Sequence, residues 1–188
     1  MKINLEKRVF IGIPIGCKIK SILPSLKSSI HSSRDVIKWT PPENIHLTLS
    51  FLGNISEREI SNVIQSIENE ITFNYFKIKV EGLGVFPSTN IPINLWAGIS
   101  KGVYELTLLH QFIEKSVRKY KASNKKEKFI PHITIARIRK SQRKIDVLPF
   151  LNTVYSPIEL DINSICLYES LLSPEGVKYI VLTEFQLN

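Results

Sequence analysis

Apolar and polar residues alternate over short stretches along much of the chain, as in strands that bury one face. Several of these stretches follow one another with no helical segment between them. Strands joined in this way favour antiparallel sheets, and hence the α+β class. The segments predicted as strands are 8–13, 36–39, 46–52, 75–80, 93–99, 130–138, 164–168 and 178–185.

Three other segments are expected to be helical. The first covers residues 17–31, where Pro24 should kink or divide the helix. Ser56 and Glu59 have the spacing of a capping box, in which both side chains satisfy free amides at a helix start. Another long helix is expected after Gly102. The last two helices each carry one apolar face, formed by Ile60, Val63, Ile64, Ile67 and Ile71, and by Val103, Leu106, Leu109, Phe112, Ile113 and Val117.

One predicted strand begins HLTLSFLG at His46, and a similar one begins HITIARIR at His132. Residues i and i+2 of a strand share a face, so His46 and Thr48 point to one side while the apolar residues between them point to the other. The same holds for His132 and Thr134. Each motif lies in its own half of the chain, near a long amphipathic helix. We therefore expect a pseudo-twofold pair of lobes that face each other, with both motifs lining one cleft.

Two imidazoles and two hydroxyls in one cleft suit phosphodiester chemistry. Because the ordinary pKa of histidine is about 6.5, one ring can take a proton from water while the other gives one to the leaving oxygen. Threonine hydroxyls can donate to the non-bridging phosphate oxygens. This chemistry requires neither a metal nor another cofactor, and we expect none.

Other interpretations of the two motifs fit less well. A metal site needs a third or fourth ligand, yet no Asp, Glu or Cys stands beside either motif. A Ser or Cys nucleophile lacks a nucleophile-elbow pattern, and two structural edge-strand histidines would not account for the duplication. His31 and His110 are interpreted as a surface and a helical histidine. By pattern alone, Phe10 belongs to the core.

Composition narrows the class of protein. The 188 residues are 43% apolar, which suits one globular domain over residues 1–188. Two cysteines, Cys17 and Cys166, are too few for a disulfide framework and fit a reducing cytoplasm. No apolar run reaches the roughly 18 residues of a membrane span, so no membrane association is expected.

Positive charge is concentrated in one segment. Of 25 basic residues, twelve fall within residues 115–144 beside a single acid, while the rest of the chain holds 13 basic and 16 acidic residues. This basic run brackets the second motif. It is either a solvated surface or a footprint for a polyanion.

Taken with the two motifs, several stretches are similar to one family: RVFIGI, WTPPEN, GLGVFPS, LWAGI and LYESLLSPEGVKYIVLTEF. The chain resembles the two-histidine (2H) phosphoesterases, and within them the LigT-like RNA 2′,3′-cyclic phosphodiesterases, historically called 2′-5′ RNA ligases. The similarity spans nearly the whole chain. It implies a bilobed α+β fold in which two antiparallel sheets, flanked by helices, meet at a central cleft.

The resemblance also implies roles for single residues. His132 would be the proton acceptor that activates water, and His46 the proton donor to the 3′-oxygen. Thr48 and Thr134 would hold the phosphate, and Arg137 would add a phosphate or ribose contact. The ring of Phe10 would stack on a terminal base.

The expected activity is metal-independent hydrolysis of RNA or oligonucleotide 2′,3′-cyclic phosphate ends to 2′-phosphates, by a monomer. Two alternatives stay open. The same site could act on another cyclic nucleotide or a 2′-5′ linkage, including 2′-5′ RNA ligation. The protein could instead be a non-catalytic RNA-binding module.

Overall fold

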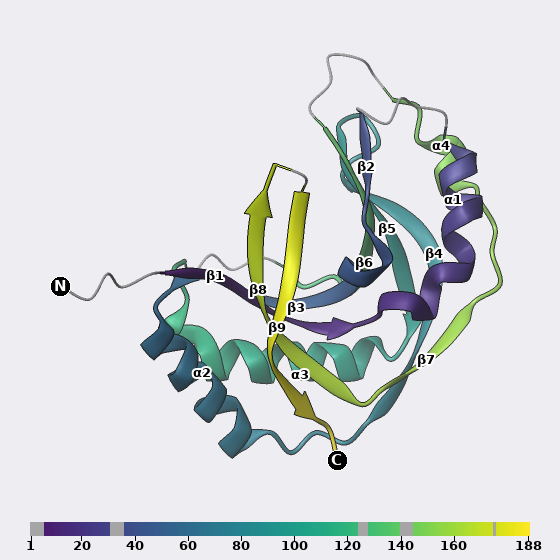
Figure 1. Cartoon of the computed structure of the whole chain (residues 1–188). Helices are drawn as coiled ribbons and strands as arrows, with labels where there is room; N and C mark the ends of the chain where they lie inside the picture. Colours follow the sequence, from purple (N-terminus) through teal and green to yellow (C-terminus); the bar gives the residue numbers. More distant parts are fainter. Residues whose placement is uncertain (1–5, 31–35, 124–127, 140–144, 175) are drawn as a thin grey trace.

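A curved antiparallel sheet of nine strands organises the computed structural model, which describes residues 6–30, 36–123, 128–139, 145–174 and 176–188 (Figure 1). The strand order is β7-β4-β5-β6-β3-β1-β8-β9, and β2 pairs with β6 outside this path. The strands are β1 (Lys7–Pro14), β2 (Ile37–Trp39), β3 (His46–Ile55), β4 (Phe76–Pro87), β5 (Pro92–Lys101), β6 (His132–Ile138), β7 (Ile158–Ile162), β8 (Ser164–Ser173) and β9 (Gly176–Gln186).

The sheet has two halves that meet at the strands carrying the two motifs. One half consists of β3, β1, β8 and β9, and the other of β6, β5, β4, β7 and β2. They are joined where Leu47 of β3 pairs with Ile133 of β6. The predicted α+β class with antiparallel pairing is confirmed. The two expected sheets are continuous at this one pairing.

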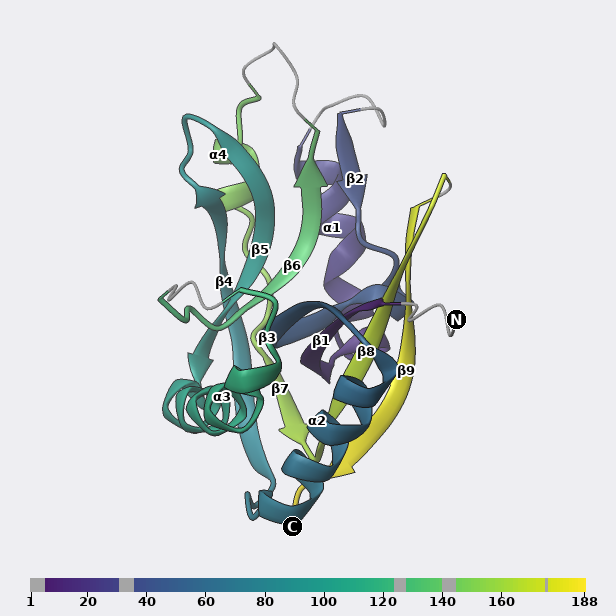
Figure 2. The same ribbon diagram turned by 90° about the vertical axis from the view of Figure 1, so that its left-hand side faces the viewer.

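The helical segments flank the sheet. They are α1 (Leu23–Ser29), α2 (Glu57–Glu70), α3 (Val103–Val117), α4 (Leu148–Leu151) and the 3-10 turns η1 (Gly16–Ile22), η2 (Pro42–Asn44) and η3 (Arg118–Tyr120). The helices α2 and α3 pack together, and α3 also contacts β3 and β5 (Figures 1 and 2). None of the helices in the described part of the chain is long and apolar enough to cross a membrane.

Two local predictions about helix starts are confirmed. Pro24 divides the first helical segment, because it lies at the start of α1 after the 3-10 turn η1. The backbone N–H of Ser56 donates to the Glu59 carboxylate at 2.8 Å, while the Glu59 N–H donates to the Ser56 hydroxyl at 3.3 Å. This reciprocal pair is the predicted capping box of α2.

Several predicted strand ends were wrong, among them that of the strand predicted over 164–168, which runs to Ser173, and one strand was missed. Gly53 was expected to end β3, but the strand continues to Ile55, because glycine accommodates a φ of +87° next to an irregularity in the pairing with β1. The strand β4 likewise passes through Gly82, at φ +78°, and ends at Pro87. The strand β7, which pairs with the first half of β4, was not predicted.

Candidate active site

The pairing of Leu47 with Ile133 sets the geometry of the site. In an antiparallel ladder, the residues that flank one paired position lie opposite the flanking residues of the partner strand. His46 is therefore across from Thr134, and Thr48 across from His132. All four side chains are partly exposed, whereas Leu47 and Ile133 are fully buried. The structure thus brings the two predicted motifs together on one face of the sheet.

Both histidines are held through the same ring nitrogen. His46 Nδ1 donates to the backbone carbonyl of Asn44 at 2.7 Å, and His132 Nδ1 donates to that of Ile130 at 2.8 Å. Because a carbonyl oxygen only accepts, each Nδ1 carries a proton. The second nitrogen, Nε2, is then free in each ring to accept or give a proton.

Aromatic rings fix the orientation of His46. The ring centroid of Phe10 lies 4.7 Å from that of His46, and Tyr179 meets His46 edge-on at 5.0 Å. Phe10 itself is stacked on Tyr168 at 4.9 Å and is only 2% exposed. The interpretation of Phe10 as a core residue is confirmed. Because the ring is buried, it has no open face for the base stacking that the resemblance implies. It packs instead against the imidazole of His46.

A matching pair of rings holds His132. Phe86 meets the imidazole of His132 edge-on at 5.0 Å, and Trp96 lies at 6.1 Å. Trp96 itself lies flat over the backbone of Gly84, where an added Cβ would fall 2.1 Å from the indole ring. These supporting residues were not predicted. Trp96 lies on β5, next to β6, and Phe86 on β4, one strand further away. Their sequence signal is that both fall in stretches similar to the family, GLGVFPS and LWAGI.

Burial keeps both histidines neutral near pH 7. It lowers the pKa of His46 to about 4, while the hydrogen bond to Asn44 opposes the shift; the charge of Arg137, and that of His132 when its ring is protonated, add smaller contributions. Burial also lowers the pKa of His132, again with help from Arg137. The charge of Arg137 therefore acts on both imidazoles.

Two equivalent β-bulges explain how Arg137 reaches the site. Arg137 follows Thr134 by three residues, so a regular strand would turn it to the opposite face. In β6, however, Thr134 pairs with Trp96 and Ala136 with Leu95, which leaves Ile135 as an extra residue. In β3, Leu49 is extra in the same way. The bulges turn Arg137 and its counterpart Phe51 to the face of the histidines.

The backbone carbonyl of each bulged residue accepts from a group outside the strand pair that carries the bulge. The carbonyl of Leu49 accepts from His110 Nδ1 of α3 at 2.8 Å, and the carbonyl of Ile135 accepts from the backbone N–H of Thr40 at 2.8 Å. His110 also stacks on Phe129 at 4.0 Å, close in sequence to the second motif. His110 is helical, as expected, but its link to the first motif was not predicted.

His31 and two lysines of the basic run, Lys125 and Lys126, fall outside the described residues. Among the residues that are described, no group of three His, Cys, Asp or Glu side chains comes together. The described cations of the basic run include Lys115 and Arg118, which line hollows next to α3.

Comparisons with known proteins agree with this geometry. The chain matches the family described as LigT like phosphoesterase over residues 18–96 and 99–179, and each segment contains one motif. An RNA 2′,3′-cyclic phosphodiesterase of Aquifex aeolicus is 34% identical over 185 residues, which cover 96% of this chain and 97% of the relative. Another from Aeropyrum pernix is 32% identical, covering 86% of this chain and 93% of the relative.

Solved structures share the fold. The crystal structure of TT0787 of Thermus thermophilus superposes with a TM-score of 0.80 at 24% identity, covering 96% of this chain and 97% of that one. The crystal structure of E. coli LigT in apo form gives a TM-score of 0.75 at 19% identity, covering 97% and 98% of the two chains. From the family match, the relatives and the paired motifs, the chain belongs to the LigT-like phosphoesterases, a family of two-histidine hydrolases.

Proposed function

We propose that the protein hydrolyses 2′,3′-cyclic phosphate ends of RNA to 2′-phosphates, without a metal ion. The observation that carries the proposal is the Leu47–Ile133 pairing, which sets two His-Thr pairs across from each other. Each histidine keeps Nε2 free, and each threonine offers a hydroxyl beside the opposite imidazole. The names of the Aquifex and Aeropyrum relatives support the substrate class.

In the proposed reaction, His132 accepts a proton at Nε2 from a water molecule while the water oxygen bonds to phosphorus. The bond between phosphorus and O3′ breaks, and His46 gives O3′ a proton from its Nε2. The product keeps the P–O2′ bond and is a 2′-phosphate with a free 3′-hydroxyl. Proton exchange with solvent then returns both rings to their starting states.

The electrostatics of the site fit these roles. The lowered pKa of His132 keeps its ring neutral and ready to accept a proton. His46 must be protonated to act as the acid, and its pKa of about 4 disfavours this before substrate binds. A phosphodiester anion next to the ring favours imidazolium, so the proton enters with the substrate. Thr48, Thr134 and Arg137 then hold the phosphate oxygens.

Product analysis on a cyclic-phosphate oligonucleotide tests the proposal. We expect a 2′-phosphate, unchanged turnover in chelator, and a loss of about 10²- to 10⁴-fold in kcat for His46→Ala and for His132→Ala. Thr107→Ala is the matched control and should keep full activity, because Thr107 is a half-buried residue of α3 whose hydroxyl donates to the carbonyl of Val103 within the same helix.

Each part of the proposal can fail separately. A 3′-phosphate product would mean that the P–O2′ bond breaks. Inactivation by chelator would overturn the metal-free mechanism, and turnover that survives both histidine substitutions would overturn the acid and base. Joining of RNA ends without hydrolysis would assign the same site to 2′-5′ ligation, and RNA binding without turnover would indicate a binding module.

The two cysteines bear on the cellular compartment in which the protein works. Cys17 is exposed and Cys166 is buried, and both are free thiols. Free thiols support the expected cytoplasmic location, because they persist in a reducing environment.

A further inference from the structure

We propose that a basic groove beside the two histidines binds the nucleotides that precede the terminal one, so that single-stranded RNA of several nucleotides is the preferred substrate. This inference rests on the proposed function. The groove has a volume of about 840 Å³ and is lined by β3, α3 and the segments on either side of residues 124–127. Thr48 and His132 lie in its wall, so the groove is continuous with the site.

Packing fixes the far end of the groove. From Thr48 the lining follows β3 to Gly53, where the backbone N–H of Ala122 donates to the carbonyl of Leu52 at 2.8 Å. An added Cβ on Gly53 would lie 2.8 Å from the Cβ of Ala122, so the two segments touch. The chain after α3 is thereby held against β3, and the groove leads away from the histidines toward the end of α3.

The lining carries excess positive charge. Among the described residues of the lining, four cations, Lys115, Arg118, Lys121 and Lys128, accompany one acid, Glu114. Lys121 Nζ binds both oxygens of Glu114, at 2.8 and 2.9 Å, and so neutralises it. The other three cations form no salt bridge with any described residue. They are available to an anionic ligand.

Glu114 is held as a carboxylate by its partners. Burial raises its pKa, but hydrogen bonds from Lys121 and from the hydroxyl of Ser50, the latter at 2.6 Å, outweigh burial and leave the pKa below its ordinary value. The ion pair with Lys121 therefore persists at neutral pH. Its charge is internally balanced, so the net attraction for a polyanion comes from Lys115, Arg118 and Lys128.

Apolar surface lies among these cations. Phe51 is 58% exposed and Ile130 is 41% exposed, and both line the groove. Phe129 is half-buried, stacks on His110 and also lines the groove. An exposed aromatic ring next to cations without a salt bridge suits single-stranded nucleic acid, because bases stack on such rings while phosphates meet the charges. A duplex would hide its base faces from such a surface.

A second hollow adjoins the groove. Lys115 and Arg118 also line this hollow of about 500 Å³, between α2 and α3, together with Ser66, Lys119 and one acid, Glu70. The two hollows thus share two cations. The charges of Lys119 and Glu70 offset each other, so the attraction for a strand at this end comes from the shared Lys115 and Arg118.

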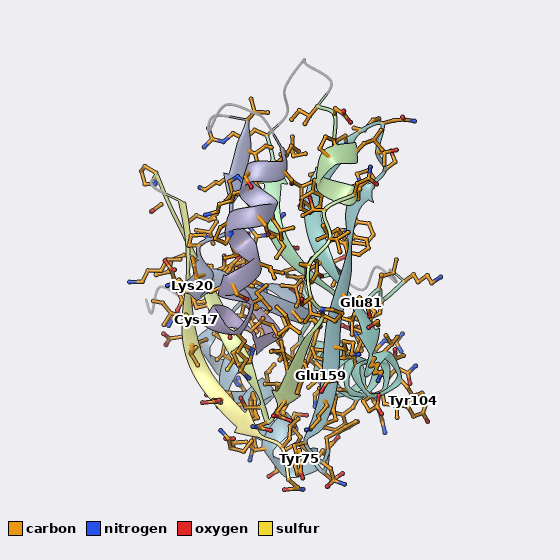
Figure 3. All side chains as sticks on the ribbon, turned by 90° about the vertical axis from the view of Figure 1, so that its right-hand side faces the viewer. Cys17, Lys20, Tyr75, Glu81, Tyr104 and Glu159 are labelled. Carbon is orange, nitrogen blue, oxygen red and sulfur yellow. The ribbon has the colours of Figure 1, made fainter. Side chains whose placement is uncertain are left out.

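The test compares two charge-matched triple variants of the full chain. One replaces the three groove cations, as Lys115→Ala/Arg118→Ala/Lys128→Ala. The control, Lys20→Ala/Lys27→Ala/Lys101→Ala, removes the same charge from exposed positions outside the groove. Figure 3 shows Lys20 on η1, on the side of the molecule opposite to α3.

Two substrates with the same last two nucleotides separate the outcomes: a dinucleotide and a ten-nucleotide single strand, both ending in a 2′,3′-cyclic phosphate. We expect the groove variant to lose about 10-fold or more in kcat/KM on the long substrate and less than about 2-fold on the dinucleotide. The slope of log binding constant against log salt should fall by about 2, from three lost phosphate contacts on a single strand. The control variant should change neither substrate selectively.

Binding of a fluorescent ten-nucleotide strand ending in a 3′-hydroxyl separates this inference from the proposed function. If the dinucleotide is not hydrolysed but strand binding weakens selectively in the groove variant, the proposed function fails and the groove stands. Three results would each overturn the groove assignment. The groove variant could lose kcat/KM equally on both substrates, or the control variant could lose as much as the groove variant. The protein could also bind a blunt duplex as tightly as the single strand.

Discussion

His110 of α3 donates its Nδ1 proton to the backbone carbonyl of Leu49, 2.8 Å away, at the bulge that follows the first motif. A bulge removes one carbonyl from the strand ladder, and that carbonyl needs another donor. In the half of the sheet that contains β6, the backbone N–H of Thr40 donates to the carbonyl of Ile135. The pseudo-twofold symmetry thus covers the bulges as well as the motifs, but with a side-chain donor at one and a backbone donor at the other.

Replacing His110 by Leu should therefore weaken both the fold and the site. The carbonyl of Leu49 would lose its donor, which costs about 1–3 kcal/mol in the free energy of unfolding. Because the bulge orients Phe51 and adjoins Thr48, we also expect kcat to fall about 10-fold at temperatures where the variant is folded. Urea denaturation and steady-state kinetics measure the two effects. Thr107→Ala, on the same helix, should change neither, and an unchanged kcat in His110→Leu would show that the bulge does not position the site.

Gly12 should tolerate no side chain, because it lies under the first motif. An added Cβ would fall 2.9 Å from the carbonyl oxygen of Leu47 and 3.3 Å from Cδ2 of His46. We expect Gly12→Ala to displace the imidazole and lower kcat by about 10- to 100-fold, with a smaller effect on KM.

The matched control for Gly12 is Gly82→Ala. Gly82 has a φ of +78° and nothing within 4 Å of an added Cβ, so its substitution strains the backbone without crowding a neighbour. It should cost stability, about 1 kcal/mol, and leave kcat unchanged. If kcat fell in both glycine variants in proportion to their loss of stability, the effect of Gly12→Ala would come from destabilisation of the fold and not from displacement of His46.

Sequence patterns predicted the parts of the site that depend on local periodicity. Alternation identified β3 and β6 and the side of each strand on which His46 and His132 lie. Alternation has a period of two, however, and a bulge is invisible to it, because the extra residues Leu49 and Ile135 are as apolar as their neighbours. The face of Phe51 could therefore not be predicted from its position in the strand.

Long-range packing was equally beyond the sequence. The resemblance suggested that Phe10 stacks on a base, while its position in an alternating strand suggested core, and burial behind His46 confirms the second. Tyr179, which meets His46 edge-on, lies 133 residues away in sequence. No local pattern links two such positions, since their contact arises only when β9 joins the sheet through β8 and β1.

The capping box of α2 offers a test of stability apart from activity. The hydroxyl of Ser56 accepts the N–H of Glu59 at 3.3 Å, at the start of a helix that contributes no residue to the two motifs. Ser56→Ala should lower the free energy of unfolding by about 1 kcal/mol, with kcat and KM unchanged. Ser61→Ala, an exposed serine further along α2, is the control and should lose less. A change in KM for Ser56→Ala would show that α2 is coupled to the site.

The buried imidazole of His46 should make the protein lose stability in mild acid. Its pKa is about 4 in the fold, against an ordinary value of 6.5. Between these pH values the unfolded chain takes up a proton that the folded protein excludes, so the free energy of unfolding falls as pH drops from 6.5 toward 4. At about 1.4 kcal/mol per pH unit, the loss from His46 at pH 4.5 is about 2–3 kcal/mol.

Comparison with His46→Gln isolates this contribution, because glutamine has no proton to gain in this range. Carboxylates such as Glu114 lose their stabilising interactions in acid in both proteins, so the difference between the two proteins reports the imidazole alone. Urea denaturation at pH 7 and at pH 4.5 should show a drop about 2–3 kcal/mol larger in the natural protein than in the variant. Equal drops would mean that His46 is protonated in the fold as easily as in the unfolded chain. The proton that it gives to O3′ would then be present before the substrate arrives.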